Sequence, residues 1–287
     1  MKLVKFREHF KSELIDQFPE TEIQSFFTII IEEYLNLQRI DLVTRPNFDI
    51  SEEKLQLLSE ILKRLKNHEP IQYILGKTEF YGLPFYVNHD VLIPRPETEE
   101  LVEWVIAEVQ KLKSDKDINT LSILDIGTGS GCIPISIKKN TSLTELSGLD
   151  ISNNAIEIAK KNSELNSSDV QFILKDILST SSLDKNYDMI ISNPPYVREL
   201  EKEEMNKNVL DHEPELALFV SDDDPLLFYR KIAILAKNNL TKNGSLFFEI
   251  NEYLGEEMID LLTDLGFTSI ELRKDIFGKD RMIKASF

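Results

Sequence analysis

Apolar residues recur at spacings of three and four over residues 1–75, which is the period of an amphipathic helix. One stripe comprises Ile23, Phe26, Phe27, Ile30, Ile31, Tyr34 and Leu35, and another comprises Leu55, Leu58, Ile61, Leu62 and Leu65. Because a helix must bury its apolar stripe against another element, the pattern predicts a small helical bundle.

From Leu121 onward, short apolar runs alternate with stretches of helical period. We expect strands over 121–127, 146–149, 170–174, 187–192 and 245–250, and helices over 132–139, 154–162 and 226–238. This alternation predicts an α/β fold with a parallel sheet covered by helices. The last stretch, 267–287, instead predicts two strands joined by a glycine-containing loop, an antiparallel hairpin at the sheet edge.

Between these regions the pattern changes again. Aromatic and β-branched residues flank Gly82-Leu83-Pro84, as in a hairpin. We therefore expect a helical domain over 1–75, a hairpin linker over 76–98 and a larger α/β domain over 99–287.

Composition narrows the classes of function. The 287 residues include 33 Lys and Arg against 50 Asp and Glu, a formal net charge of -17 that disfavours phosphate backbones and anionic membrane surfaces. The single cysteine excludes an internal disulfide, and the four histidines show no metal-ligand spacing, so no metal site is expected. Frequent charges near the N-terminus predict neither a secretion signal nor a membrane span, and hence a cytoplasmic protein.

The first chemical signal is the segment LDIGTGSGCIPISI, in which Gly127, Gly129 and Gly131 lie between a predicted strand and a predicted helix. Glycines there allow either a close approach of a nucleoside cofactor or simply a tight turn. Asp150 ends the next predicted strand, where a carboxylate can accept hydrogen bonds from ribose hydroxyls, and Asp176 ends the third. For each acid alone, a helix cap or a solvated strand end is the alternative.

Two cofactor classes fit these motifs. A dinucleotide usually requires G-x-G-x-x-G to seat its pyrophosphate, whereas this chain has G-x-G-x-G. S-adenosylmethionine carries no phosphate. The order of the motifs resembles the Rossmann-like class I methyltransferase fold, which also ends in an antiparallel hairpin.

The segment SNPPYV (192–197) ends the fourth predicted strand, at the same sheet edge as the glycine loop and both acids. Two prolines cannot continue a sheet, so their carbonyls are not paired with a neighbouring strand, and Asn193 adds a side-chain carbonyl. Such acceptors suit a planar NH₂ group that must face a sulfonium methyl, and Tyr196 is placed to pack over it. A plain Pro-Pro turn is the alternative.

NPPY-type motifs resemble those of amino-methyltransferases that act on adenine in DNA, on guanine in ribosomal RNA or on protein glutamine. Three further segments resemble the release factor glutamine methyltransferase family (PrmC/HemK type): EPIQYILGKTEFYGLPFYVNHDVLIPRPETEELV (69–102), HEPELAL (212–218) and GKDR (278–281). The resemblance extends over residues 1–287 and is weakest in the helical N-terminal part.

This resemblance implies methyl transfer from S-adenosylmethionine to the side-chain amide nitrogen (N5) of the glutamine in the GGQ motif of peptide chain release factors. The alternative is a DNA or rRNA amino-methyltransferase acting on an exocyclic base amine; an inactive binding module and a dinucleotide oxidoreductase are more distant. The implied partners are release factors, with no nucleic acid or membrane bound directly, and the chain is expected to be a monomer. The N-terminal bundle either recognises the release factor, which we favour, or only packs on the catalytic domain.

By the same resemblance, S-adenosylmethionine would contact Phe80, Gly127, Thr128, Gly129, Ser130, Gly131, Asp150, Asp176, Ile177 and Asn193. The glutamine would be held by Asn193, Pro194, Pro195 and Tyr196, with Asn193 and Pro194 as the catalytic pair. Arg95 and Glu97 would either shape the entrance or form an ion pair that fixes the linker. Where the family has Glu-Ile-Gly and a nearby glutamine, this chain has EINEYLGEE, so the roles of Asn251 and Leu254 stay open.

Overall fold

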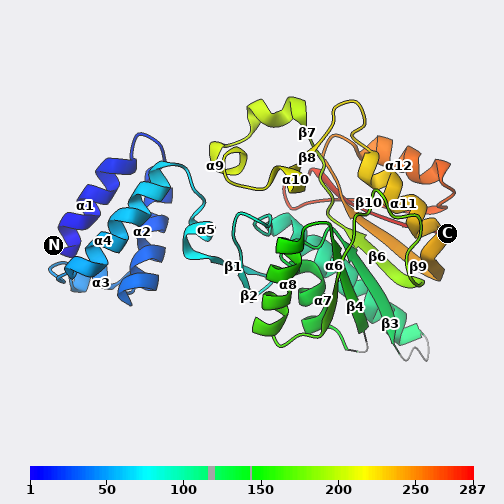
Figure 1. Cartoon of the computed structure of the whole chain (residues 1–287), viewed down its shortest axis with the longest axis horizontal. Helices are drawn as coiled ribbons and strands as arrows, with labels where there is room; N and C mark the ends of the chain where they lie inside the picture. Colours follow the sequence, from blue (N-terminus) through cyan, green and yellow to red (C-terminus); the bar gives the residue numbers. More distant parts are fainter. Residues whose placement is uncertain (116–119, 143) are drawn as a thin grey trace. The chain divides into compact units, whose positions relative to one another are not determined.

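The structure, a computed structural model, describes residues 1–115, 120–142 and 144–287. These form two compact units, drawn in Figure 1. The smaller unit comprises Met1–Leu75 with Lys207–His212, and the larger unit comprises Gly76–Asn206 with Glu213–Phe287.

The smaller unit is helical, as its apolar stripes predict. Its helices are α1 (Leu3–Leu14), α2 (Glu20–Leu35), α3 (Asp41–Thr44), α4 (Glu52–Lys66), α5 (Ile71–Leu75) and α9 (Lys207–Leu210). Phe6, Phe10 and Phe27 form an aromatic cluster with ring centroids 5.3–6.2 Å apart. The Ser51 hydroxyl accepts a hydrogen bond from the Lys54 N–H at 3.3 Å and so caps α4. The unit therefore has a hydrophobic core of its own.

The larger unit is built on a seven-stranded sheet in the order β10-β11-β9-β6-β3-β4-β5. Its strands are β3 (Leu121–Ile126), β4 (Thr144–Asp150), β5 (Val170–Leu174), β6 (Tyr187–Ser192), β9 (Leu240–Glu249), β10 (Ser269–Lys274) and β11 (Asp280–Ser286). Strands β3, β4, β5, β6 and β9 run parallel, whereas β11 pairs antiparallel with both β9 and β10. The expected α/β sheet with an antiparallel C-terminal hairpin is confirmed.

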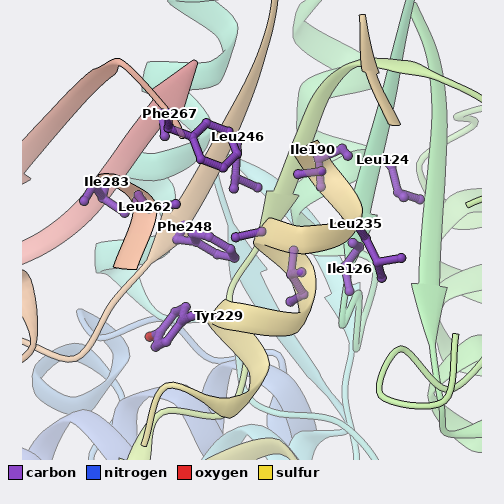
Figure 2. Close-up of a cluster of buried hydrophobic side chains, with 14 of the residues drawn as sticks. Leu124, Ile126, Ile190, Tyr229, Leu235, Leu246, Phe248, Leu262, Phe267 and Ile283 are labelled. Atoms are coloured by element: carbon purple, nitrogen blue, oxygen red, sulfur yellow. The ribbon is translucent and has the colours of Figure 1, made fainter. Parts of the chain in front are cut away.

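Helices cover both faces of this sheet. The helices of the larger unit are α6 (Pro96–Asp115), α7 (Cys132–Asn140), α8 (Asn153–Leu165), α10 (Glu215–Leu218), α11 (Leu227–Asn239) and α12 (Gly255–Asp264), with a 3₁₀ helix at Glu199–Glu204. On one face, residues of α11 and α12 join Leu124, Ile190 and Phe248 in the cluster drawn in Figure 2. On the other face, residues of α6 and α7 pack on Ile123 and Phe247. Neighbouring residues along a strand thus point to opposite, equally buried faces, which explains the nearly continuous apolar runs.

Two short strand pairs accompany the main sheet. Strands β1 (Lys77–Phe80) and β2 (Leu83–Tyr86) form the antiparallel hairpin expected around Gly82, and β7 (Val197–Arg198) pairs parallel with β8 (Phe219–Val220). Among the described residues, no helix combines the length and apolar character needed to cross a bilayer.

The order of the sheet reverses beside β3. This strand pairs with β4, the next strand along the chain, and on its other side with β6. The carboxyl ends of β3, β4 and β6 therefore meet at one edge of the sheet, and such a switch point is where open α/β sheets bind ligands.

A buried asparagine ties the β1–β2 hairpin to the main sheet. Asn162 of α8 is fully buried; its side-chain oxygen accepts from the Tyr86 N–H at 2.6 Å, and its amide donates to the carbonyls of Tyr86 and Ser130 at 3.0 and 2.9 Å. Asn166 adds a bond to the Pro84 carbonyl at 2.8 Å. The Asn162 side chain thus links the β1–β2 hairpin, helix α8 and the glycine loop.

We expect Asn162→Ala to lower the free energy of unfolding by about 2–4 kcal/mol, because it leaves buried backbone groups of Tyr86 and Ser130 without their partner. Urea denaturation would measure the change. Asn238→Ala, the same substitution at an exposed site on α11, is the matched control and is expected to shift the unfolding free energy by under about 0.5 kcal/mol. Equal stabilities for the two variants would contradict the structural role of Asn162.

Candidate active site

A cavity of about 290 Å³ lies at the switch point of the sheet. Eight of the residues predicted from the sequence line it: Gly127, Gly129, Asp150, Asp176, Ile177, Asn193, Pro194 and Pro195. They come from the segments that follow β3, β4, β5 and β6, so the tertiary structure brings four separate motifs together. The volume is close to the lower end of the range for small-molecule sites.

The glycine loop forms the floor beside β4. The N–H groups of Gly127 and Thr128 both donate to the Leu149 carbonyl, at 2.8 and 2.9 Å, which fixes the loop to the end of β4. Gly127 and Gly129 have φ angles of +78° and +53°, a region that L-residues rarely adopt. A Cβ built on Gly129 would meet no atom within 4 Å, so open space lies over this part of the loop.

Asp150 is held by the backbone on both of its oxygens. Oδ2 accepts from the Gly129 N–H at 2.8 Å, and Oδ1 accepts from the Ser152 N–H at 2.9 Å. Burial raises the pKa of this carboxyl, while the backbone hydrogen bonds act against the rise. Because each oxygen keeps a second lone pair, the fixed carboxylate can still accept from a pair of ligand hydroxyls.

Asp176 follows β5 and lines the cavity beside Ile177. Its Oδ1 accepts from the Leu178 N–H at 2.9 Å, which orients the side chain. Ile151, Ile177 and Leu178 add apolar walls to the same cavity. The arrangement offers a slot between apolar side chains with a carboxylate at its edge.

The NPPY turn closes the cavity from the β6 side. The Ser192 hydroxyl donates to the Ile126 carbonyl at 2.7 Å, and the Asn193 amide nitrogen donates to the Thr98 hydroxyl at 3.3 Å. Within the part of the chain that the structure describes, no donor is hydrogen-bonded to the Asn193 side-chain oxygen or to the carbonyls of Pro194 and Pro195. These three oxygen acceptors therefore remain available to a ligand.

Tyr196 lies behind the turn, with its hydroxyl directed into the protein. This hydroxyl donates to Glu249 Oε1 at 3.0 Å, and burial raises the Tyr196 pKa further above its ordinary value. The Tyr196 carbonyl accepts from the Asn251 amide at 3.0 Å. Asn251, one of the departures from the family pattern, is buried and also donates to Glu201, while Leu254 belongs to the hydrophobic core.

Several predicted cofactor contacts are not at the cavity. Phe80 is 1% exposed and packs on Phe85 with ring centroids 6.1 Å apart, in the hydrophobic cluster that includes residues of α6, and it is not among the residues that line the cavity. Thr128 and Ser130 are buried, and neither is among the residues that line the cavity. A Cβ on Gly131 would come within 3.1–3.3 Å of Ile135, Ala159 and Phe172, so this glycine permits close packing of α7, α8 and β5.

Arg95 forms an ion pair with a residue far along the chain. Its guanidinium donates to Glu213 Oε1 at 2.6 Å, and the Ile93 N–H donates to Glu213 Oε2 at 3.3 Å. Glu213 is 4% exposed and precedes Pro214, which lines the cavity. Of the two expectations for Arg95, the structure favours the fixing ion pair, with Glu213 rather than Glu97 as its partner.

No motif assigned a role to Asp125, which lies in β3 just before the glycine loop. It is fully buried, and among the described residues neither of its oxygens has a hydrogen bond of good geometry, although the Thr128 hydroxyl lies close enough to favour its charged form. Burial raises its pKa to about 7; the Thr128 hydroxyl acts against this rise, and the nearby Asp150 charge adds to it. The segment His89–Leu92 and Phe228 also line the cavity without any motif to mark them; Asp125 could have been noticed as an acid inside an apolar strand.

The donor set fits S-adenosylmethionine better than a dinucleotide. A fixed carboxylate at the end of β4 suits the ribose hydroxyls, the apolar slot suits an adenine ring, and the open space over Gly129 leaves room for a chain without phosphate. Carboxylates around the cavity favour a cationic ligand over a pyrophosphate.

Comparisons with known proteins agree with this geometry. Residues 109–215 match the model of the methyltransferase small domain, and residues 7–76 match that of the PrmC N-terminal domain. A release factor glutamine methyltransferase of Flavobacterium psychrophilum is 53% identical over 100% of both chains, and one of Bacteroides thetaiotaomicron is 43% identical over 97% of this chain and 98% of that protein. Among solved structures, the hMettl16 catalytic domain in complex with an RNA hairpin has a TM-score of 0.59 at 16% identity, covering 77% of this chain and 83% of that chain, which shows the fold alone.

A sheet of this order, with its cavity at the reversal beside β3, is the architecture of the class I S-adenosylmethionine-dependent methyltransferases. The identity over full length places the chain within that class. It belongs to the release factor glutamine methyltransferase family.

We expect Asp125→Asn to become more stable relative to the wild type as pH rises. Because burial raises the pKa of Asp125 to about 7 in the folded state, from an ordinary value of 3.8, the folded protein binds this proton more tightly than the unfolded chain does. Stability is therefore lost as pH rises between these values, by about 1.4 kcal/mol per pH unit and about 4 kcal/mol in all, and the asparagine variant does not lose it.

Urea denaturation of both proteins at pH 5, 6, 7 and 8 would measure this difference. Asp16→Asn, the same substitution at an exposed site, is the matched control. A constant difference between Asp125→Asn and the wild type over the range would mean that the Asp125 carboxylate has a partner that stabilises its charge.

Proposed function

We propose that this protein transfers a methyl group from S-adenosylmethionine to the N5 side-chain nitrogen of the glutamine in the GGQ motif of peptide chain release factors. The reaction follows from membership of the family. The residue roles given below are our proposal and rest on the contacts of the site.

The observation that supports these roles most directly is the set of free acceptors at the NPPY turn. The Asn193 side-chain oxygen and the carbonyls of Pro194 and Pro195 are rigidly placed at the cavity and have no protein donor among the described residues. A primary amide presents two N–H donors in one plane, which is the complement of such a set. Asn193 and Pro194 accept from the substrate NH₂, and Pro195 shapes the turn.

Amide nitrogen is a poor nucleophile because its lone pair is delocalised into the carbonyl group. Hydrogen bonds from both N–H groups to Asn193 and Pro194 hold the nitrogen in one orientation, and acceptors that bind the N–H groups more strongly as positive charge develops lower the barrier. No strong base is required before transfer, because the nitrogen becomes acidic on attack and loses its proton afterwards. Positioning and electrostatics therefore supply the rate enhancement.

The methyl donor supplies an electrophilic carbon on a positively charged sulfur. Asp150 would accept from its ribose hydroxyls, Asp176 and Ile177 would bound its adenine, and the loop of Gly127 and Gly129 would lie under its amino acid part. The Gly129 N–H donates to Asp150 at 2.8 Å, so the proposed ribose site and the glycine loop are fixed to each other.

Recognition of the whole release factor is assigned to the smaller unit. A GGQ loop alone offers little surface for specificity, and the smaller unit exposes apolar side chains at Ile40 and Val43, which are 60% and 77% exposed. The protein acts as a monomer in the cytoplasm, where translation ends, and its net charge of -17 disfavours direct binding of nucleic acid.

We expect Asn193→Ala to lower kcat at least about 100-fold, because it removes an acceptor that aligns the substrate amide. Mass spectrometry of a release factor, incubated with enzyme and S-adenosylmethionine, would follow the gain of one methyl group on the GGQ glutamine. Calorimetry would show whether the variant still binds the methyl donor, and Asn238→Ala is the control for an asparagine outside the site.

Near-normal turnover by Asn193→Ala would contradict the role of the amide. If the wild-type enzyme leaves the glutamine unmodified but methylates DNA or ribosomal RNA in parallel reactions, the proposed substrate is wrong and the exocyclic base amine is the alternative.

We expect the double variant Ile40→Ser with Val43→Ser to raise KM for the intact release factor several-fold and to leave turnover of a short GGQ peptide unchanged. Both side chains are exposed, so the fold should tolerate the change. Steady-state kinetics on the two substrates would separate recognition from chemistry. Unchanged KM for the intact factor would exclude this surface from recognition.

A further inference from the structure

A buried chain of hydrogen bonds lies directly behind the NPPY turn. Glu249, the last residue of β9, is 1% exposed; its Oε2 accepts from the Thr98 hydroxyl at 2.6 Å, and its Oε1 accepts from the Tyr196 hydroxyl at 3.0 Å. Thr98 lies in the first turn of α6 and is 3% exposed. The Thr98 hydroxyl also accepts from the Asn193 amide at 3.3 Å. The chain therefore runs from a buried carboxylate to the side chain that faces the substrate.

The protonation state of the Glu249 carboxyl determines which groups donate and which accept in these hydrogen bonds. Burial raises the pKa of this carboxyl, whereas the hydroxyls of Thr98 and Tyr196 and the nearby guanidinium of Arg281 favour its charged form. Each oxygen of Glu249 has one hydroxyl directed at it, which is the arrangement expected around a carboxylate. An ionised carboxylate only accepts hydrogen bonds.

A threonine hydroxyl has a single hydrogen, and in this structure it goes to Glu249. The lone pairs of the Thr98 oxygen are then the groups left to face Asn193. A lone pair can accept a hydrogen bond from the NH₂ of a side-chain amide, but not from the amide oxygen, which has no hydrogen to donate. The Thr98 hydroxyl thus selects one of the two orientations of the Asn193 amide.

That selection matters for the reaction, because the two ends of an asparagine amide have nearly the same shape and opposite hydrogen-bonding character. With the nitrogen facing Thr98, the oxygen faces the cavity as an acceptor. After a flip, an NH₂ group would face the NH₂ of the substrate, and two donors cannot pair.

We propose that Thr98 and Glu249 are positioning residues of the methyltransferase: Glu249 orients the Thr98 hydroxyl, which in turn holds the Asn193 amide with its oxygen toward the substrate. This inference rests on the proposed role of Asn193. The Tyr196 hydroxyl donates to the other oxygen of the Glu249 carboxylate, and the Asn251 amide donates to the Tyr196 carbonyl. The NPPY turn is therefore fixed on both sides.

Two substitutions at Thr98 separate hydrogen bonding from packing. Thr98→Val keeps the shape of the side chain and removes the hydroxyl, whereas Thr98→Ser keeps the hydroxyl and removes a methyl group. We expect Thr98→Val to lower kcat on a GGQ-containing release factor about tenfold or more, since it loses the bond that orients Asn193. We expect Thr98→Ser to retain kcat within about threefold.

The dissociation constant for S-adenosylmethionine, measured by calorimetry, is expected to change less than about twofold in both variants, because Thr98 does not line the cavity. Thr144→Val is the matched control: Thr144 is also 3% exposed, its hydroxyl lies 3.1 Å from that of Thr141, and it is remote from the NPPY turn at the start of β4. Its kcat should equal that of the wild type.

Glu249→Gln provides an independent test that does not change Thr98. A glutamine amide can donate to the Thr98 oxygen and so release the threonine hydrogen toward Asn193, and we expect kcat to fall several-fold. If Thr98→Val fails to bind the methyl donor, this variant decides the question.

Three results would overturn the inference: wild-type kcat for Thr98→Val, equal losses for Thr98→Val and Thr98→Ser, or wild-type kcat for Glu249→Gln. The second would mean that Thr98 acts only through packing. Absence of release factor methylation by the wild-type enzyme would instead refute the proposed function, so the two failures are distinguishable.

Discussion

The pairing of two parallel strands, β3 and β6, is the constraint on which the site depends. Their register places Ile126 beside Ser192, and the Ser192 hydroxyl donates to the Ile126 carbonyl at 2.7 Å. The glycine loop and the NPPY turn therefore begin at the same level of the sheet. A Cβ on Gly127 would stand only 3.9 Å from the Asn193 carbonyl, so the two segments approach each other closely.

Buried polar groups around this point have a shared character. Asp125, Asp150 and Glu249 are carboxyls whose pKa burial raises, and they lie on three strands that end near the cavity. Removing charge from water destabilises the fold unless hydrogen bonds or a counter-charge compensate. Two hydroxyls compensate Glu249 and two backbone N–H groups compensate Asp150, whereas only the Thr128 hydroxyl, without a hydrogen bond of good geometry, acts on Asp125. The carboxyl groups at the ends of these strands thus favour a cationic ligand.

The periodicity of the sequence was sufficient for the fold class, because both faces of the sheet and one stripe of each helix are buried. The periodicity predicted the four strands β3, β4, β5 and β6 and the C-terminal hairpin. Strand β9 begins at Leu240, before the expected start at residue 245. For the site, chain position predicted the residues that end a strand or directly follow one, such as Asp150 and Asn193. It did not reveal that Phe80 is buried in the cluster with residues of α6, and it assigned no role to Thr98 or Asp125.

The sequence by itself determined which chemical groups stand at the ends of the strands, since strand periodicity and proline chemistry are local properties. Only the tertiary structure decided which distant groups those residues meet. Glu249 and Thr98 are 151 positions apart, and Arg95 and Glu213 are 118 apart. Such contacts depend on strand order and helix packing, which no local pattern encodes, and hydrogen-bond direction then follows from which donor meets which acceptor.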